Sequence, residues 1–336
     1  MKLSIVDISP VSEGVTRTQA LHNTIKLAQK AEELGYTRFW VAEHHSAASV
    51  AGRAPEIMIA AIAAKTKSIL VGSGSVLLNH YSSYKVAEVF STLEEIYPNR
   101  IDLGIGRATT GPISDIALQQ DRSKRFHSNS NEQLAELLAW LENSFPSDHA
   151  FSTIPIYSVE SKPNAYLLGS SIWSSDAAAL LGLRYVFAGF INQLGAPSIT
   201  ENYFKKFNPS TAATSVETPE LIMSVHAVCA DTEMEARRLL APVTYMYKNL
   251  GKGKLDEKLF HPENAIELLG YIPELVKYDP ETKLIPKFIA GTQEMVKEQL
   301  DQIAKDYNVE EFIIQDVITD FDARLHSYEL LSEFIE

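Results

Sequence analysis

Short apolar stretches alternate with segments of helical spacing along this chain, and this alternation constrains its fold more than any other feature. The strand-like stretches are residues 3–8, 39–42, 69–71, 100–105, 166–169, 184–188, 221–228 and 311–315. Between the first two, Leu21, Ile25, Ala28 and Ala31 recur at helical spacing. Strands that alternate with helices predict a parallel sheet. Eight such repeats predict an α/β fold, a single (β/α)8 barrel.

The length of the chain leaves room for insertions in that barrel. A bare barrel needs roughly 250 residues, and the chain has 336. Residues 108–129 are polar and irregular, and residues 249–287 are rich in lysine, glutamate and proline. We therefore expect one domain over residues 1–336, with insertion loops near 108–129 and 249–287.

Composition excludes several classes of partner. The net charge of −13 argues against nucleic acid and against an anionic membrane surface. The single cysteine, Cys229, excludes an internal disulfide and is typical of a reducing compartment. The longest apolar run near the start, Ile57 to Ala64, is too short to span a bilayer, and no signal peptide is recognisable. We expect a soluble cytoplasmic protein.

The second predicted strand ends in three ionisable residues, Glu43, His44 and His45. In a parallel barrel, the carboxyl ends of the strands form the active face. These side chains either form a solvated strand end or belong to a site. Successive strand side chains point to opposite faces, so adjacent histidines do not easily share one metal ion. We expect one histidine to point into a pocket and the other to support its rim, with no metal.

Small residues follow the third and fourth strands. Gly72-Ser73-Gly74-Ser75 indicates either a plain turn or the close approach of a ligand. Gly104-Ile105-Gly106 resembles a dinucleotide fingerprint, but position 109 is threonine and the motif ends its strand, so we reject that interpretation. A flat surface for a planar ligand fits better, with Arg107 as a fixed positive charge or a surface cation.

Serines cluster after the fifth strand, before a predicted helix at residues 176–181. Hydroxyls and free amides at a helix N-terminus form an anion site, typically for phosphate. Helix capping explains one serine but not four. The serines are Ser170, Ser171, Ser174 and Ser175. His226, inside the seventh strand, has apolar neighbours and is typical of a core histidine.

Several stretches together resemble the bacterial luciferase-like flavin monooxygenase superfamily, in its subgroup of uncharacterised oxidoreductases. They are residues 39–45, 71–78, 100–107, 168–174 and 182–188, in the family's order. The resemblance implies a luciferase-like TIM barrel with a flavin at the C-terminal face. It makes His44 the active-site histidine, with Glu43 and His45 in support.

The same resemblance assigns the cofactor site. Gly74-Ser75 matches a bond that is often a non-proline cis peptide behind the flavin ring. Gly106 stands where luciferases have a cysteine, and Arg107 matches a flavin-contacting arginine. Ser170, Ser171 and Ser174 match the phosphate-binding turn. One departure is Glu132, which stands where luciferases have an arginine that contacts the phosphate. Lys124 or Arg125 could take the place of that arginine.

The activity that this resemblance implies is a two-component monooxygenase. Reduced FMN, supplied by a separate flavin reductase, and O2 would oxygenate a small organic substrate. Alternatives on the same barrel are a deazaflavin-dependent dehydrogenase and a non-catalytic flavin-binding protein. A metal-dependent hydrolase would need converging ligands that the sequence does not show. The resemblance and the nearly all-apolar helix that starts at Pro55 favour a homodimer.

Overall fold

Each predicted strand forms, and together they close into a parallel barrel. The structure, a computed structural model, describes residues 1–118, 130–154, 161–210, 212, 214–250 and 258–335. The sheet runs in the order β10-β1-β2-β3-β5-β6-β7-β8, and the pairing of β8 with β10 closes it. The strands are β1 (Lys2–Asp7), β2 (Arg38–Val41), β3 (Leu70–Ser73), β4 (Val76–Leu77), β5 (Ile101–Gly106), β6 (Asn164–Gly169), β7 (Arg184–Ala188), β8 (Leu221–Cys229), β9 (Ile289–Gly291) and β10 (Glu311–Gln315).

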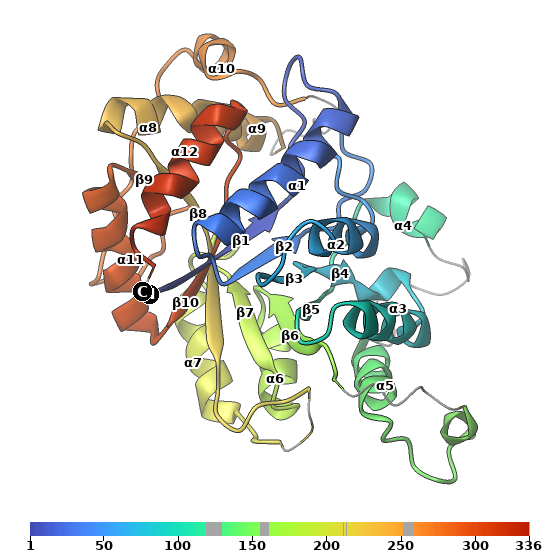
Figure 1. The fold of residues 1–336 in the computed structure, drawn as a ribbon. Coiled ribbons are helices and arrows are strands. Elements are labelled where there is room, and N and C mark those ends of the chain that lie inside the picture. The colour runs from blue at the N-terminus through green and yellow to red at the C-terminus, as the bar shows by residue number, and fades with distance from the viewer. Residues whose placement is uncertain (119–129, 155–160, 211, 213, 251–257, 336) are drawn as a thin grey trace.

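Helices surround this barrel (Figure 1). They are α1 (Arg17–Glu33), α2 (Pro55–Ala63), α3 (Ser83–Ile96), α4 (Pro112–Leu118), α5 (Ser130–Glu142), α6 (Ile172–Leu180), α7 (Ala196–Lys206), α8 (Glu233–Leu239), α9 (Ala241–Leu250), α10 (Pro262–Leu269), α11 (Gln293–Tyr307) and α12 (Phe321–Ser332), with 3-10 turns η1 (Leu78–His80) and η2 (Ala150–Thr153). Helix α1 begins with a capping box between Thr16 and Gln19. Gly35 follows the helix with a positive φ of 84°, which glycine adopts without steric cost.

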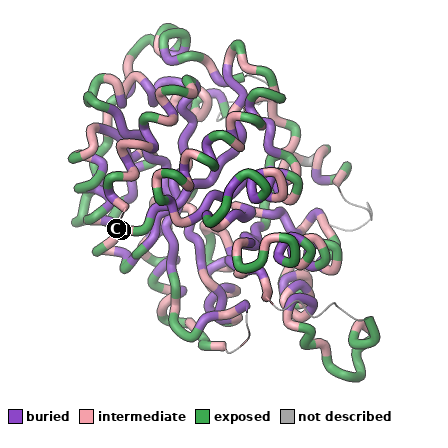
Figure 2. Tube along the Cα trace, viewed as in Figure 1, coloured by how far each residue is buried: buried purple, intermediate pink, exposed green. Residues whose placement is uncertain are grey.

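The apolar core has two layers because alternate strand residues point to opposite faces of the sheet. The outer layer lies between the strands and the helices and includes Leu3, Phe39 and Leu103. The inner layer fills the barrel and includes Val6, Trp40 and Ile222. Figure 2 shows the central strands buried and the outer turns of the helices exposed.

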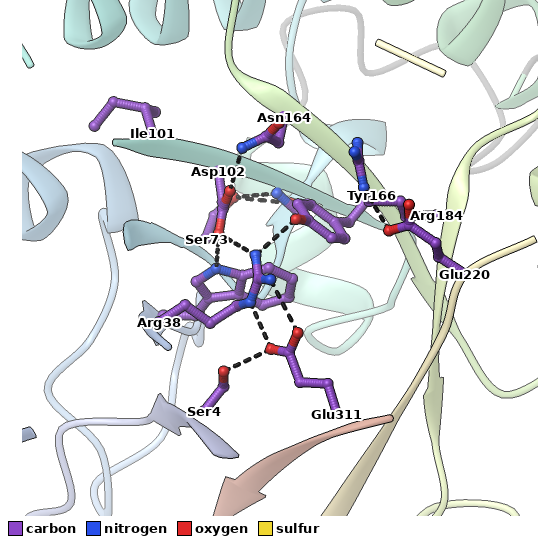
Figure 3. A network of polar contacts seen from close by, with 12 residues as sticks. Ser4, Arg38, Ser73, Ile101, Asp102, Asn164, Tyr166, Arg184, Glu220 and Glu311 are labelled. Atoms are coloured by element: carbon purple, nitrogen blue, oxygen red, sulfur yellow. Dashed lines mark hydrogen bonds and ion pairs between the residues drawn. The ribbon is translucent and has the colours of Figure 1, made fainter. Parts of the chain in front are cut away.

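A buried polar network fills the N-terminal end of the barrel (Figure 3). Arg38 binds both carboxylate oxygens of Glu311, with Nε at 2.6 Å, and its Nη1 lies 2.7 Å from Asp102. Burial alone would lower the pKa of Arg38, but the Asp102 and Glu311 carboxylates raise it well above its usual value. Asp102 also accepts a hydrogen bond from Trp40 Nε1 at 2.9 Å. The network therefore fixes the Trp40 ring inside the barrel.

The structure corrects several predictions of local structure. Residues 108–129 are not wholly irregular, because α4 forms within them, and α9 and α10 occupy parts of the second insertion. Helices α7 and α11 were not predicted, and α6 begins at Ile172 rather than at residue 176. Within one chain, α2 buries one face only, and Ile57 on its other side is 66% exposed.

Candidate active site

Glu43 is the centre of a compact hydrogen-bond network at the end of β2. Its buried carboxylate accepts from Tyr81 Oη at 2.7 Å, from His45 Nε2 at 2.7 Å and from the Leu77 amide at 2.9 Å. Burial, followed by the hydrogen bond to Glu43, raises the pKa of Tyr81. Glu43 therefore joins the end of β2 to the segment around β4 and η1.

His44 has the opposite environment. It is exposed, yet desolvation by the surrounding protein lowers its pKa, and the nearby Glu43 carboxylate only partly opposes that effect. Because its pKa is lowered, the imidazole of His44 is neutral near pH 7. That one histidine faces a pocket while the other supports its rim stays a prediction: His45 bonds the buried Glu43 carboxylate, and His44 is exposed. The neutral imidazole of His44 can accept or donate a proton.

The small residues after β3 and β5 form a closely packed surface. The Gly74-Ser75 peptide bond is cis. A Cβ on Gly74 would lie 2.8 Å from Val6 and 3.1 Å from the Trp40 ring, and a Cβ on Gly106 would lie 1.9 Å from Ser75 Oγ. A side chain at either position would displace its neighbours. The position where luciferases have a cysteine must therefore remain glycine while Ser75 keeps this rotamer.

A pocket opens beside Gly106 and carries polar atoms without partners. Its walls include Asn79, Arg107, Ser130 and Trp173. The Asn79 Oδ1 and Ser130 Oγ atoms are buried and have no hydrogen-bond partner within the part of the chain that the structure describes. Buried polar groups are nearly always hydrogen-bonded in folded proteins, so these two atoms point to a missing ligand. We call the walls formed by these five residues the cradle.

The cation of the cradle is held by an aromatic ring. The guanidinium of Arg107 lies 4.0 Å from the centroid of Trp173, and the residue forms no ion pair with any residue that the structure describes. Desolvation lowers the pKa of Arg107, but a guanidinium stays charged in proteins. Trp173 lies in the first turn of α6, which places the positive charge near the N-terminus of that helix.

Some serines at the start of α6 have buried, hydrogen-bonded hydroxyls, and others have accessible hydroxyls. Ser171 caps α6 in a reciprocal capping box with Ser174. Ser174 is buried and bonds the Ser171 carbonyl at 2.8 Å, with Tyr185 Oη at 3.0 Å. Ser175 faces α7 and donates to the Ile199 carbonyl. Capping thus explains two serines instead of one, and the accessible hydroxyls on this turn are those of Ser170 and Ser171.

The first insertion is fastened to this region through His80. His80 Nε2 lies 3.1 Å from Asp115 Oδ1 on α4. Asp115 also accepts from the Thr109 hydroxyl and from the Thr110 amide and hydroxyl. Burial would raise the pKa of Asp115, but these hydrogen bonds lower it. The loop after Arg107 therefore folds back onto η1.

The phosphate contact that luciferases make with an arginine near Glu132 gains no support from this geometry. Glu132 is exposed on α5. Lys124 and Arg125 lie outside the described residues. Where the chain is described, no three His, Cys, Asp or Glu side chains converge to hold a metal ion. Within the same residues, no helix is both long and apolar enough to cross a membrane.

Sequence reasoning missed Tyr81, Asn79, Ser130 and Trp173. Each lies outside the predicted strand ends, in a turn or at the start of a helix. Only Trp173 left a local signal, as an aromatic residue inside the serine cluster. The pairing of Trp173 with Arg107 joins β5 to α6, which no local pattern predicts.

Comparisons with known proteins match nearly the whole chain, including the residues of this site. A family model described as luciferase-like monooxygenase matches residues 1–309. YwcH of Bacillus subtilis, an uncharacterised protein, is 42% identical over 99% of this chain and 98% of its own length. An N-acetyl-S-alkylcysteine monooxygenase of the same organism is 36% identical over 100% and 98%, respectively. The crystal structure of apo-MsnO8 is 39% identical with a TM-score of 0.88, covering 99% of this chain and 97% of that one.

Proposed function

The chain belongs to the luciferase-like monooxygenase family, whose members are oxygen-incorporating oxidoreductases, and on that premise we propose that it is a two-component flavin monooxygenase. In this proposal a separate reductase supplies reduced FMN. One atom of O2 goes to a small organic substrate and the other leaves as water, with the reduced flavin giving two electrons. Bound at the barrel mouth, FMN would supply the oxygen-activating chemistry.

The cradle is the observation that carries this proposal. Among the described residues, Asn79 and Ser130 offer unpaired polar atoms, Gly106 presents bare backbone, and Arg107 offers a cation without an ion pair. These features fit a planar, polar and anionic cofactor. Gly74 and Ser75 would support the ring of such a cofactor from the barrel side. Ser170, Ser171 and Ser174, as the turn at the N-terminus of α6, would hold its phosphate.

The residues at the end of β2 take separate roles in the proposal. His44, neutral and accessible, would move a proton at the reacting atoms. Glu43 and His45 support it: their mutual hydrogen bond fixes the backbone on both sides of His44. The barrel mouth must also exclude water from the reacting atoms.

The relative named for N-acetyl-S-alkylcysteine guides the choice of substrate. That molecule carries both a carboxylate and a sulfide. The monooxygenase named for it matches this chain over its whole length. We propose small organic acids with an oxidisable sulfur as the first substrates to test. The described parts of the insertions at 108–129 and 249–287 would contribute to the substrate pocket of one domain, residues 1–336.

Anaerobic titration with reduced FMN tests the proposal, with two serine variants as a matched pair. Ser171→Ala removes an accessible hydroxyl from the phosphate turn, whereas Ser175→Ala removes a buried hydroxyl that faces α7. A hydrogen bond to a charged group contributes roughly 1.5–3 kcal/mol, which corresponds to at least about a tenfold loss of affinity. We expect that loss in Ser171→Ala alone.

Two outcomes would overturn parts of the proposal. Equal affinities for both variants would remove Ser171 from the phosphate site. Binding of reduced deazaflavin but not of reduced FMN would make the protein a hydride-transferring dehydrogenase instead. Oxygen consumption with bound reduced FMN, together with an oxygenated product, would establish the monooxygenase.

We also propose that the protein is a homodimer that uses α2. The helix is apolar on nearly all sides, and Ile57 is 66% exposed within one chain. A second copy that covers this side would remove apolar surface from water.

A further inference from the structure

A second cavity, of about 210 Å³, lies away from the cradle. It is an open cavity lined by the start of α9, the segment after α10 and the two residues that precede β9. Leu240, Thr244, Val276, Lys287 and Phe288 are among its walls. The cavity thus combines apolar walls, a hydroxyl and a cation at the end of the second insertion.

Lys287 has no acidic partner in this cavity. Its ammonium lies 3.4 Å from the centroid of the Tyr247 ring, and it forms no ion pair within the described part of the chain. Desolvation lowers the pKa of Lys287. The nearby carboxylate, Glu274, is already paired with Arg237 Nη2. Lys287 is therefore a partly desolvated but exposed cation that has no ion-pair partner among the described residues.

Aromatic rings continue inward from Lys287. We call Phe190, His226, Tyr247 and Phe288 the aromatic group. The His226 ring lies 4.3 Å from that of Phe190, 5.4 Å from that of Phe288 and 6.0 Å from that of Tyr247, centroid to centroid. The rings come from four different segments of the chain and meet at β8. Of the four, Phe288 lines the cavity, so the aromatic group continues from the cavity wall towards β8.

Hydrogen bonds hold His226 and Tyr247 in this group. His226 Nδ1 lies 3.2 Å from the Gln315 carbonyl, so Nδ1 must carry a proton and donate it. Burial lowers the pKa of His226 to about 4, which keeps the ring neutral near pH 7. Its Nε2 therefore accepts from Tyr247 Oη at 3.0 Å. Tyr247 is thus fixed between the barrel interior and Lys287.

One apolar layer connects this group with the cofactor side of the barrel. Tyr247 and Phe288 pack against the inner core layer that contains Trp40 and Val6. Trp40 and Val6 in turn lie directly behind Gly74, because a Cβ on Gly74 would touch both. A ligand on the aromatic group therefore shares a continuous inner wall with the residues behind Gly74.

We propose that the cavity and the aromatic group form the substrate subsite, and that it takes a carboxylic acid with an apolar tail. This inference rests on the proposed function and adds the residues that would bind the substrate's carboxylate and its apolar tail. The tail packs on Phe288 and Phe190, and the carboxylate pairs with Lys287. A monoanion fits better than a phosphate, because a single lysine would leave half of a dianion's charge unpaired.

Two probes that differ only in their head group test this subsite. They are N-acetyl-S-benzyl-L-cysteine and its carboxamide, titrated calorimetrically into the full-length protein with and without FMN. We expect the acid to bind the wild-type protein at least about ten times more tightly than the amide. Lys287→Met removes the charge at similar length and should abolish that preference. Lys283→Met changes another exposed lysine of the same insertion and should keep the preference for the acid.

A third variant tests the tail. Phe288→Ala should weaken the acid and the amide by the same factor, because it removes only apolar contact. The inference is overturned if the wild-type protein binds acid and amide equally, if Lys287→Met keeps the preference, or if neither probe binds at millimolar concentration. The wild-type comparison decides the question even where a variant fails to fold.

The readout separates this inference from the proposed function. Binding of the probes is measured without turnover, and the affinity for reduced FMN is measured separately. Loss of FMN binding with an intact acid preference would refute the monooxygenase and leave a carboxylate site. FMN binding and oxygen consumption without an acid preference would refute the subsite alone.

Discussion

Glu43→Ala separates a structural role of Glu43 from a catalytic one. Glu43 accepts three hydrogen bonds, from Tyr81, His45 and the Leu77 amide, at 2.7–2.9 Å. Hydrogen bonds to a charged acceptor contribute roughly 1.5–3 kcal/mol each, but bonds in one network do not add fully. Alanine also leaves three donors without a partner. We therefore expect the free energy of unfolding to fall by about 4 kcal/mol.

The corresponding shift in melting temperature follows from chain length. The entropy of unfolding is about 2.1 cal/mol/K per residue, or roughly 0.7 kcal/mol/K for this chain. A loss of about 4 kcal/mol then lowers Tm by about 6 °C. Calorimetry of Glu43→Ala measures this shift, with the exposed Glu88→Ala as the matched control. Glu43→Gln keeps an acceptor of the same shape and should lose about half as much.

One result would refute this reasoning. If Glu43→Ala melts within about 1 °C of the wild-type protein, the three contacts contribute little to stability. A loss of activity at unchanged Tm would then assign Glu43 to the chemistry itself. If the expected shift appears, Glu43 is a positioning residue, and its effect on turnover arises through the backbone around His44.

Three further predictions concern His44, His226 and Ile57. His44→Ala should lower turnover by about 10²–10⁴-fold with unchanged affinity for reduced FMN. His22→Ala, which changes an exposed histidine, should alter neither quantity. In the wild-type protein, activity should decrease only at pH values under 6.5, where His44 gains its proton, because the pKa of His44 is lowered. His226 has a folded-state pKa of about 4 against 6.5 for an ordinary histidine, so the unfolded state binds the proton first as pH falls. Urea unfolding should therefore show up to about 3 kcal/mol lost between pH 6.5 and 4 in the wild-type protein, and an equal loss in His226→Gln would contradict this assignment. Ile57→Glu should turn a dimer into a monomer by analytical ultracentrifugation, and an unchanged mass would exclude α2 from the interface.

The sequence by itself determined the barrel and the ends of its strands. Strand and helix periodicities are local properties, and eight alternations admit few other folds. The same locality predicted Glu43 and His44 at the end of β2 and Arg107 at the end of β5. It also predicted a serine turn there, although the sequence does not distinguish Ser174, which is buried inside the capping box, from Ser171, which caps α6 and faces solvent.

Only the tertiary structure decided which of these groups meet. Tyr81 lies 38 residues from Glu43, and Trp173 comes from α6 while Arg107 follows β5. The aromatic group draws on four segments, and Lys287 comes at the end of an insertion with no recognisable motif. Such contacts depend on how the barrel closes and how its loops fold back. Sequence periodicity describes one element at a time and therefore carries no information about them.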